Sequence, residues 1–183
     1  MNVEWGGPAA LAEDEPALTA GDSRLGPWRA FLQAHARLFR RLDEELRDEH
    51  GLSLPEYDAL VQLAQAPDRR LRMSRLANRL LLSKSGVTRL IDRLVADGFV
   101  ERVHCSHDAR GAEASLTRAG LERLREASRT HLDGVGRYFV DPLGPGGLAQ
   151  VERAMQAISR AVGDDTDQRG AVCVPAEHGE ARA

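Results

Sequence analysis

The residues with the clearest chemical use lie on one predicted helix that follows Ser83. Apolar side chains recur there at spacings of three and four, which predicts a helix with one buried face. The opposite face gathers hydroxyl groups and cations, namely Lys84, Ser85, Thr88, Arg89, Asp92 and Arg93. Hydroxyls reach bases or phosphates, and arginine can pair with a guanine edge through two hydrogen bonds. Such a face is typical of a helix that reads the DNA major groove, although a solvated helix shows the same pattern.

Residues before and after this helix define its limits. Ser83 is a suitable N-cap, and Gly98 is placed to end the helix as a left-handed residue. Leu76 and Leu80 give the preceding segment the apolar edge of a short helix. The spacing therefore predicts a helix-turn-helix whose second helix presents the polar face.

A hairpin is predicted directly after this pair of helices. Residues 99–105 and 112–116 are strand-like runs on either side of a turn-rich tip that holds Asp108 and Arg110. The strand signal is modest because alanine is a poor strand former. A helix-turn-helix followed by a charged hairpin predicts a winged helix, in which an arginine at the tip enters the minor groove.

Specific motifs then resemble the MarR family of winged helix-turn-helix transcription regulators. They are Asp108-Ala109-Arg110, Leu116-Thr117-Arg118-Ala119-Gly120, Arg89-Leu90-Ile91-Asp92-Arg93-Leu94 and Gly98-Phe99-Val100-Glu101-Arg102. The resemblance extends more weakly over residues 28–163. One departure is Ala109, where the family often carries a second arginine.

The resemblance implies a mainly α fold. A winged helix-turn-helix core with a small β-hairpin wing would be flanked by N- and C-terminal dimerisation helices. It implies a homodimer that binds double-stranded DNA at pseudo-palindromic operators, as a repressor. The residues expected to contact DNA are Ser83, Lys84, Ser85, Thr88, Arg89, Arg93, Asp108 and Arg110.

The net charge of the whole chain argues against a nucleic-acid partner, but the distribution of charge along the chain favours one. The 183 residues carry a formal net charge of -3, yet residues 69–110 hold ten cations against four anions. This segment is therefore at +6 and the rest of the chain at -9. Lys84 is the only lysine, so the clustering of arginines is better evidence than any one of them.

Other classes of site have little support. Cys105 and Cys173 lack metal-ligand spacing, and the six histidines form no zinc motif, so neither a metal nor a cofactor is expected. No catalytic constellation or phosphate-binding loop is found, and the protein is not expected to be an enzyme. An apolar run long enough for a membrane span is also absent from the sequence, which favours a cytoplasmic protein.

Organisation along the chain predicts a single domain over residues 26–163. A flexible arm over residues 1–25 precedes it and a disordered tail over 164–183 follows. Inside the domain, the DNA-binding core spans about 53–117, and the dimerisation helices span about 27–50 and 118–163.

Finer signals place the remaining elements. Ser53 and Glu56 have the spacing of a capping box for a helix that ends near Gln65. Leu71 and Arg72 can form only a minimal strand that pairs with the hairpin. Helices are expected over residues 118–139 and 148–162, with the two prolines and three glycines between them as a break.

Two questions stay open at this level. The resemblance implies an effector pocket lined by Trp28, His35, Phe39 and Tyr57, which would suit a small aromatic or phenolic molecule. Plain core packing accounts for the same four residues. The alternative function is a protein-interaction adaptor that keeps the winged-helix scaffold without reading DNA. Cations on both the helix and the wing favour the regulator.

Overall fold

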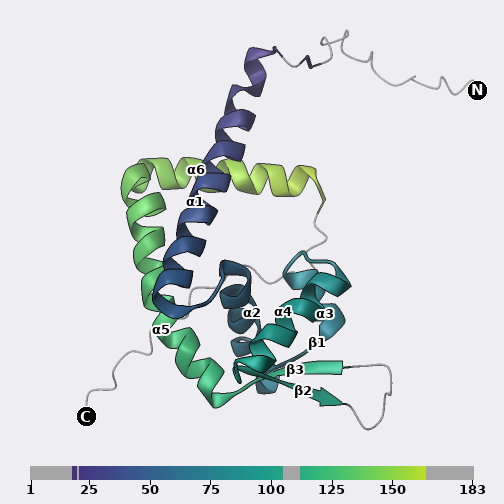
Figure 1. Cartoon of the computed structure of the whole chain (residues 1–183). Coiled ribbons are helices and arrows are strands. Elements are labelled where there is room, and N and C mark those ends of the chain that lie inside the picture. The colour runs from purple at the N-terminus through teal and green to yellow at the C-terminus, as the bar shows by residue number, and fades with distance from the viewer. Residues whose placement is uncertain (1–17, 20, 105–111, 164–183) are drawn as a thin grey trace, which may run out of the picture. The chain divides into compact units, whose positions relative to one another are not determined.

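The computed structural model describes residues 18–19, 21–104 and 112–163. Helices dominate, with one small sheet (Figure 1). The α-helices are α1 (Gly26–His50), α2 (Leu54–Ala64), α3 (Met73–Arg79), α4 (Lys84–Ala96), α5 (Arg118–Val135) and α6 (Asp141–Ala161). The strands are β1 (Arg70–Arg72), β2 (Val100–His104) and β3 (Ala112–Leu116). Short 3-10 turns are η1 (Ser23–Leu25) and η2 (Pro67–Arg69), and η3 (Gly136–Val140) is a π turn. The predicted mainly α winged-helix fold is confirmed.

Two compact units divide the chain, residues 1–37 and residues 38–183, and α1 begins in the first and ends in the second. In the first unit, the rings of Trp28 and Phe31 stack with centroids 5.9 Å apart. His35 lies 6.1 Å from Phe31, so one face of the helix carries a row of rings. Within the described ranges, no helix combines the length and the apolar character that crossing a membrane requires.

Helix α2 is the centre of the second unit's core. It packs against α3, α4, α5 and two strands, and most of its side chains are buried. Leu46 of α1 joins this core and is fully buried. The other large side chains that are fully buried are Leu52, Leu60, Leu63, Leu76, Val87, Ile91, Leu94 and Val100. Burial of the apolar stripe of α4 is what turns its polar face outward.

The sheet is antiparallel, with strand order β1-β3-β2. Leu71 pairs with Ala114, so the predicted pairing of the minimal strand with the hairpin is confirmed. Val100 pairs with Leu116 at the base of the hairpin, and both are buried. The sheet therefore fixes the base of the wing to the core. Cys105 and the predicted wing tip lie outside the described residues.

Helix caps follow the predicted chemistry. Ser53 and Glu56 form the capping box of α2, with each side chain bonded to the other's backbone N–H. Ser83 caps α4, and Gly98 follows that helix in the left-handed region with φ 75°. Thr117 caps α5 by accepting a hydrogen bond from the backbone N–H of Gly120.

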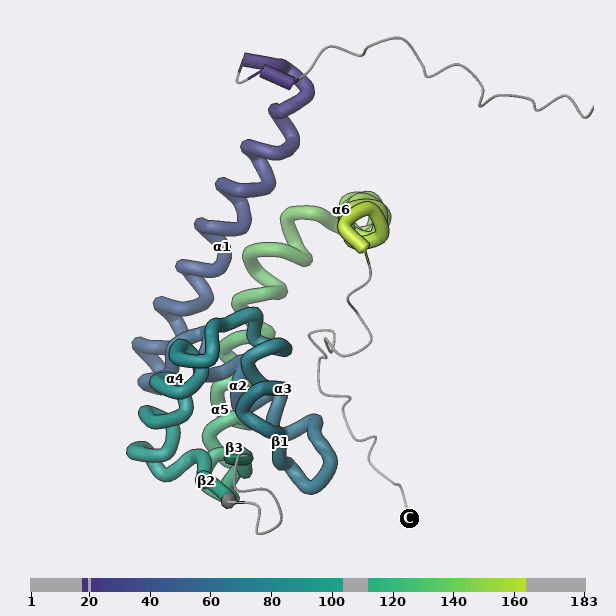
Figure 2. Tube along the Cα trace, turned by 90° about the vertical axis from the view of Figure 1, so that its right-hand side faces the viewer, coloured from purple at the N-terminus to yellow at the C-terminus, as the bar shows by residue number. Residues whose placement is uncertain are grey.

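The break predicted between residues 141 and 147 is confirmed at Gly144. Helix α5 ends at Val135, the π turn follows it, and α6 begins at Asp141. Pro142 lies in the first turn of α6, where proline is tolerated. Gly144 then leaves the helical conformation, with φ 58° and ψ 177°, and the helix resumes with Pro145 after this kink. Figure 2 shows α6 end-on, with its axis turned away from that of α5. The predicted arm and tail lie outside the described residues, apart from residues 18–19 and 21–25.

Candidate nucleic-acid interface

Helices α3 and α4 form the predicted helix-turn-helix. They pack together, and the chain between them turns through Leu81, a left-handed residue with φ 54°. Ser83 then begins α4, whose Val87, Leu90, Ile91 and Leu94 are buried. All six residues of the predicted polar face are exposed, namely Lys84, Ser85, Thr88, Arg89, Asp92 and Arg93.

Two cations on this face are available for a ligand. Among the described residues, neither Lys84 nor Arg89 has a side-chain hydrogen bond or an ion pair. They lie five positions apart on α4, and both are exposed. A long cation that is not held by the protein is able to reach either a base edge or a phosphate.

Hydroxyl groups on the same face are partly used by the helix itself. Ser83 accepts a hydrogen bond from the N–H of Gly86, and its Oγ lies 3.2 Å from that of Ser85. Thr88 donates its hydroxyl proton to the carbonyl of Lys84, one turn earlier. The Thr88 oxygen therefore retains acceptor capacity, which suits a donor on a base edge.

A strand of the wing is tied to α4. The Nη2 atom of Arg102, in β2, donates to the Asp92 carboxylate at 2.6 Å and to the Thr88 carbonyl at 3.4 Å. Asp92 thus serves the protein's own architecture, because it fixes the base of the hairpin against the helix. Asp108 and Arg110, the predicted wing contacts, lie outside the described residues.

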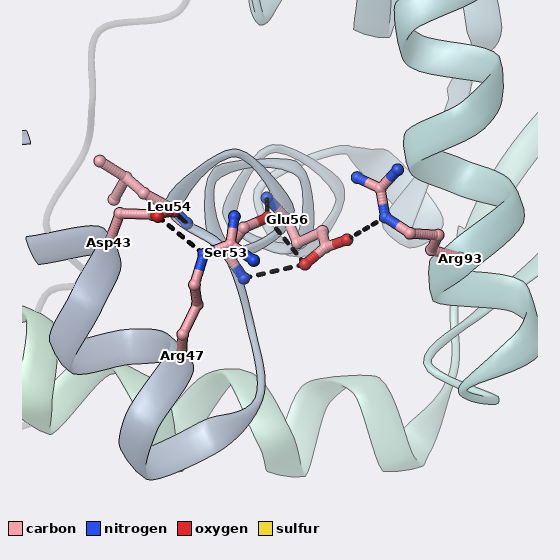
Figure 3. Close-up of polar contacts among 6 residues, drawn as sticks. All are labelled: Asp43, Arg47, Ser53, Leu54, Glu56 and Arg93. Carbon is pink, nitrogen blue, oxygen red and sulfur yellow. Dashed lines mark hydrogen bonds and ion pairs between the residues drawn. The ribbon is translucent and has the colours of Figure 1, made fainter. Parts of the chain in front are cut away.

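Arg93 has a partner that the sequence pattern did not indicate. Its Nε donates to Oε1 of Glu56 at 2.6 Å, between α4 and α2 (Figure 3). The two residues are 37 positions apart, so no helical spacing could reveal the pair. Glu56 was recognisable only as part of a capping box, which uses one carboxylate oxygen and leaves the other for a neighbour.

The Glu56 carboxylate is kept in its charged form. Burial alone would raise its pKa, but hydrogen bonds from the Ser53 backbone and from Arg93 outweigh burial and lower it. The pKa of Asp43 in α1 is also lowered. Burial would raise it, but hydrogen bonds from Arg47 and from the backbone N–H of Leu54 outweigh burial. Both carboxylates are therefore anions at neutral pH.

The four residues of the predicted effector pocket have different surroundings. Trp28 and His35 belong to the first unit, and Trp28 is exposed. In the second unit, Phe39 is exposed and Tyr57 is buried.

Tyr57 has neighbours on α5 that the pattern did not single out. Its hydroxyl lies 3.4 Å from Ser128, and its ring centroid is 4.6 Å from that of His131. Burial raises the pKa of Tyr57 and lowers that of His131. Both groups are therefore neutral at pH 7. Among the described residues, no group of three or more histidine, cysteine or carboxylate side chains could hold a metal ion.

Comparison with known proteins places this geometry in a family. Residues 50–111 match the model described as the MarR family. The chain is 40% identical over 76 residues to the HTH-type transcriptional repressor YetL of Bacillus subtilis (strain 168). That match covers 42% of this chain but only 46% of YetL, less than half of the relative's length.

Solved structures extend the similarity to most of the chain. The MarR family regulator AbsC of Streptomyces coelicolor is 34% identical, with TM-score 0.71, and 96% of it is covered by 79% of this chain. Sco3205 from the same organism, crystallised with DNA, is 33% identical with TM-score 0.74; 82% of this chain covers 93% of it. The fold, the helix-turn-helix and these identities together show that the chain belongs to the MarR family of winged helix-turn-helix transcription regulators.

Proposed function

We propose that this chain is a cytoplasmic, homodimeric repressor that binds pseudo-palindromic operators in double-stranded DNA. The observation that carries the proposal is the outer face of α4, where Lys84 and Arg89 are exposed and, among the described residues, unpaired. Sco3205 was crystallised with DNA, and the relative YetL is named a repressor. Both support the proposal for this chain.

Each site residue has a proposed role. Arg89 reads a guanine edge, and Ser85 and Thr88 contact bases beside it. Lys84 and Arg93 bind phosphates, and Ser83 fixes the start of the helix. On the wing, Arg110 enters the minor groove and Asp108 orients its guanidinium.

Dimer formation is supported by helices that leave apolar residues uncovered. Helix α6 has no buried residue; Ile158 on it is 54% exposed, and Val162, the C-cap residue that follows it, is 79% exposed. A second copy would cover such a face. Two-fold symmetry would also double the number of bases read, since one recognition helix contacts only a few base pairs.

An effector is the last part of the proposal. A small aromatic or phenolic acid would bind beside Tyr57, where the Nδ1 of His131 is buried without a hydrogen-bond partner among the described residues. At constant ionic strength, an aromatic acid such as benzoate should raise the melting temperature and weaken DNA binding. Acetate is the control, and equal effects of both acids would contradict a specific pocket.

The central experiment is selection of duplexes from a random pool by the purified protein, followed by binding to singly substituted versions. Pseudo-palindromic duplexes should be enriched. Arg89→Ala should cost about 1–3 kcal/mol and relax the preference at one position in each half-site. Ser159→Ala, on α6, is the control and should leave affinity and preference unchanged. Failure to enrich any duplex, or equal losses by Arg89→Ala on every duplex, would contradict base reading by this face.

A further inference from the structure

Arg93 is the one cation of the α4 outer face for which the structure gives an anionic partner. Its side chain remains 57% exposed, whereas that of Glu56 is only 9% exposed. Figure 3 shows Nε of Arg93 directed at the carboxylate and the two terminal nitrogen atoms pointing away from it. The guanidinium is therefore held at its inner edge and presented at its outer edge.

Glu56 is a rigid anchor because both of its oxygens are engaged. Oε2 accepts from the backbone N–H of Ser53 at 2.8 Å and from the Ser53 hydroxyl at 2.7 Å. Oε1 accepts from Arg93 at 2.6 Å. Three charge-assisted hydrogen bonds leave the carboxylate little freedom to follow a moving arginine.

The start of α2, which carries Glu56, is itself fastened to α1. The Asp43 carboxylate accepts from the backbone N–H of Leu54 at 2.8 Å and from Nε of Arg47 at 2.7 Å (Figure 3). Asp43 thus satisfies a donor in the first turn that the capping box does not use. With this support the first turn of α2 is a fixed base for the Glu56–Arg93 pair.

Two effects of Glu56 on a DNA phosphate have opposite signs. As an anion close to the duplex, it would weaken binding by repulsion. As the partner of Nε, it reduces the rotamer freedom that an exposed arginine otherwise loses on binding. The sign of a substitution at Glu56 therefore reports which effect dominates.

We propose that Glu56 is a positioning residue for DNA binding, which fixes Arg93 through Nε so that the two terminal nitrogens face a backbone phosphate. The inference rests on the proposed function, because it needs a duplex against the outer face of α4. It adds the first turn of α2 to the DNA-binding machinery, although Glu56 itself is buried and touches no nucleic acid.

The test is a double-mutant cycle in the full-length protein with Glu56→Gln and Arg93→Ala. Glutamine retains the capping box, but its one carbonyl oxygen cannot serve both Ser53 and Arg93. The probe is a fluorescein-labelled 30-base-pair duplex of mixed sequence, followed by anisotropy over a range of KCl concentrations. Mixed sequence suffices because a phosphate contact carries no sequence preference.

Glu56→Gln should weaken binding at least about threefold, the loss expected when a charge-assisted hydrogen bond no longer holds the arginine. In the Arg93→Ala background the same change should cost nothing. Glu122→Gln is the matched control, since Glu122 pairs with Arg118 at 2.9 Å on α5 and the change removes the same charge. It should leave affinity unchanged or slightly higher. Tighter binding by Glu56→Gln, or an equal loss in both backgrounds, would overturn the positioning role.

A second measurement does not depend on the folding of a Glu56 variant. In ¹⁵N-labelled wild-type protein, the Nε–H signal of Arg93, assigned through Arg93→Lys, should exchange with water more slowly than that of Arg89. Equal exchange rates would overturn the inference. Absence of duplex binding by the wild type would instead reject the proposed function, whereas neutral variants in a DNA-binding wild type reject only the positioning role.

Discussion

Gly120 fills a position where a side chain would collide with the backbone. A Cβ atom there would lie 2.1 Å from the carbonyl oxygen of Phe99 and 2.8 Å from Cδ1 of Leu116. The same carbonyl accepts hydrogen bonds from the backbone N–H and the hydroxyl of Thr117. The motif Leu116-Thr117-Arg118-Ala119-Gly120 therefore has a structural role. Thr117 caps α5, and Gly120 lets α5 pack closely against the chain that follows α4.

Replacing Gly120 with alanine should lower the free energy of unfolding by about 1–3 kcal/mol, the usual cost of overpacking. Gly136→Ala is the matched control, because nothing lies within 4 Å of the added Cβ and the residue has right-handed helical φ and ψ. That variant should be neutral or more stable by up to about 1 kcal/mol. Urea unfolding measures both, and equal effects would contradict the steric account.

Asp58 on α2 has a destabilising charge at neutral pH. Burial raises its pKa from 3.8 to about 6, and no hydrogen bond or ion pair from the described residues offsets it. A folded-state pKa above the unfolded value means that the folded protein binds the proton more tightly. This group's contribution to stability therefore falls as pH rises from about 4 to about 6.

Asp58→Asn should therefore raise the free energy of unfolding at pH 7.5, by about 1–2 kcal/mol. At pH 4.5 the gain should largely disappear, because Asp58 is then protonated in the folded wild type. Chemical denaturation at both pH values compares variant with wild type, which cancels the contributions of the other carboxylates. The same gain at both pH values would contradict a titrating Asp58.

At the scale of the element, local signals predicted the parts that obey local rules. The capping box, the Ser83 cap and the Gly98 stop each depend on neighbours within a few residues, and all three are confirmed. The outward face of α4 also followed from apolar spacing. Its partners did not, because Glu56 and Arg102 reach α4 from distant segments that only the folded core brings together.

The interruption within α6 was also predicted from local composition. Two prolines and three glycines between residues 141 and 147 indicated a break. The break lies at Gly144, which leaves the helical region, whereas Pro142 occupies a first turn, where it costs no hydrogen bond. Composition therefore predicted that the helix would be interrupted, but not which of these residues would leave the helical conformation.

The turn between α3 and α4 carries strain at Leu81. This residue has φ 54° and is 73% exposed, so its side chain contributes little packing. Leu81→Gly should leave the free energy of unfolding unchanged or raise it by up to about 1 kcal/mol, since relief of strain offsets the entropy of glycine. The control Leu82→Gly, at an ordinary φ, should destabilise the protein. Equal losses in thermal unfolding would contradict strain at Leu81.

At the scale of the whole molecule, the proposed dimer makes α6 the element to test. Ile158→Glu places a charge on its apolar face and should convert the dimer into a monomer at micromolar concentration. Gln150→Glu adds the same charge on another side of α6 and should leave the dimer intact. Sedimentation velocity distinguishes the two. Two dimeric variants would remove α6 from the interface, and a monomeric wild type would reject the dimer itself.

The close contact at Gly120 and the π turn lie at opposite ends of α5. A small rotation of this helix at one end therefore displaces its other end. Eighteen residues at 1.5 Å each give α5 a length of about 27 Å. A tilt of about 5° at one end would displace the other by roughly 2 Å. In a dimer joined through α6, a small rotation at Gly120 would change the separation of the two α4 helices. That separation has to match the distance between successive major grooves, which is about 34 Å. In the proposed dimer, the contact between Phe99 and Gly120 would therefore limit how far the separation of the two α4 helices can deviate from the half-site spacing.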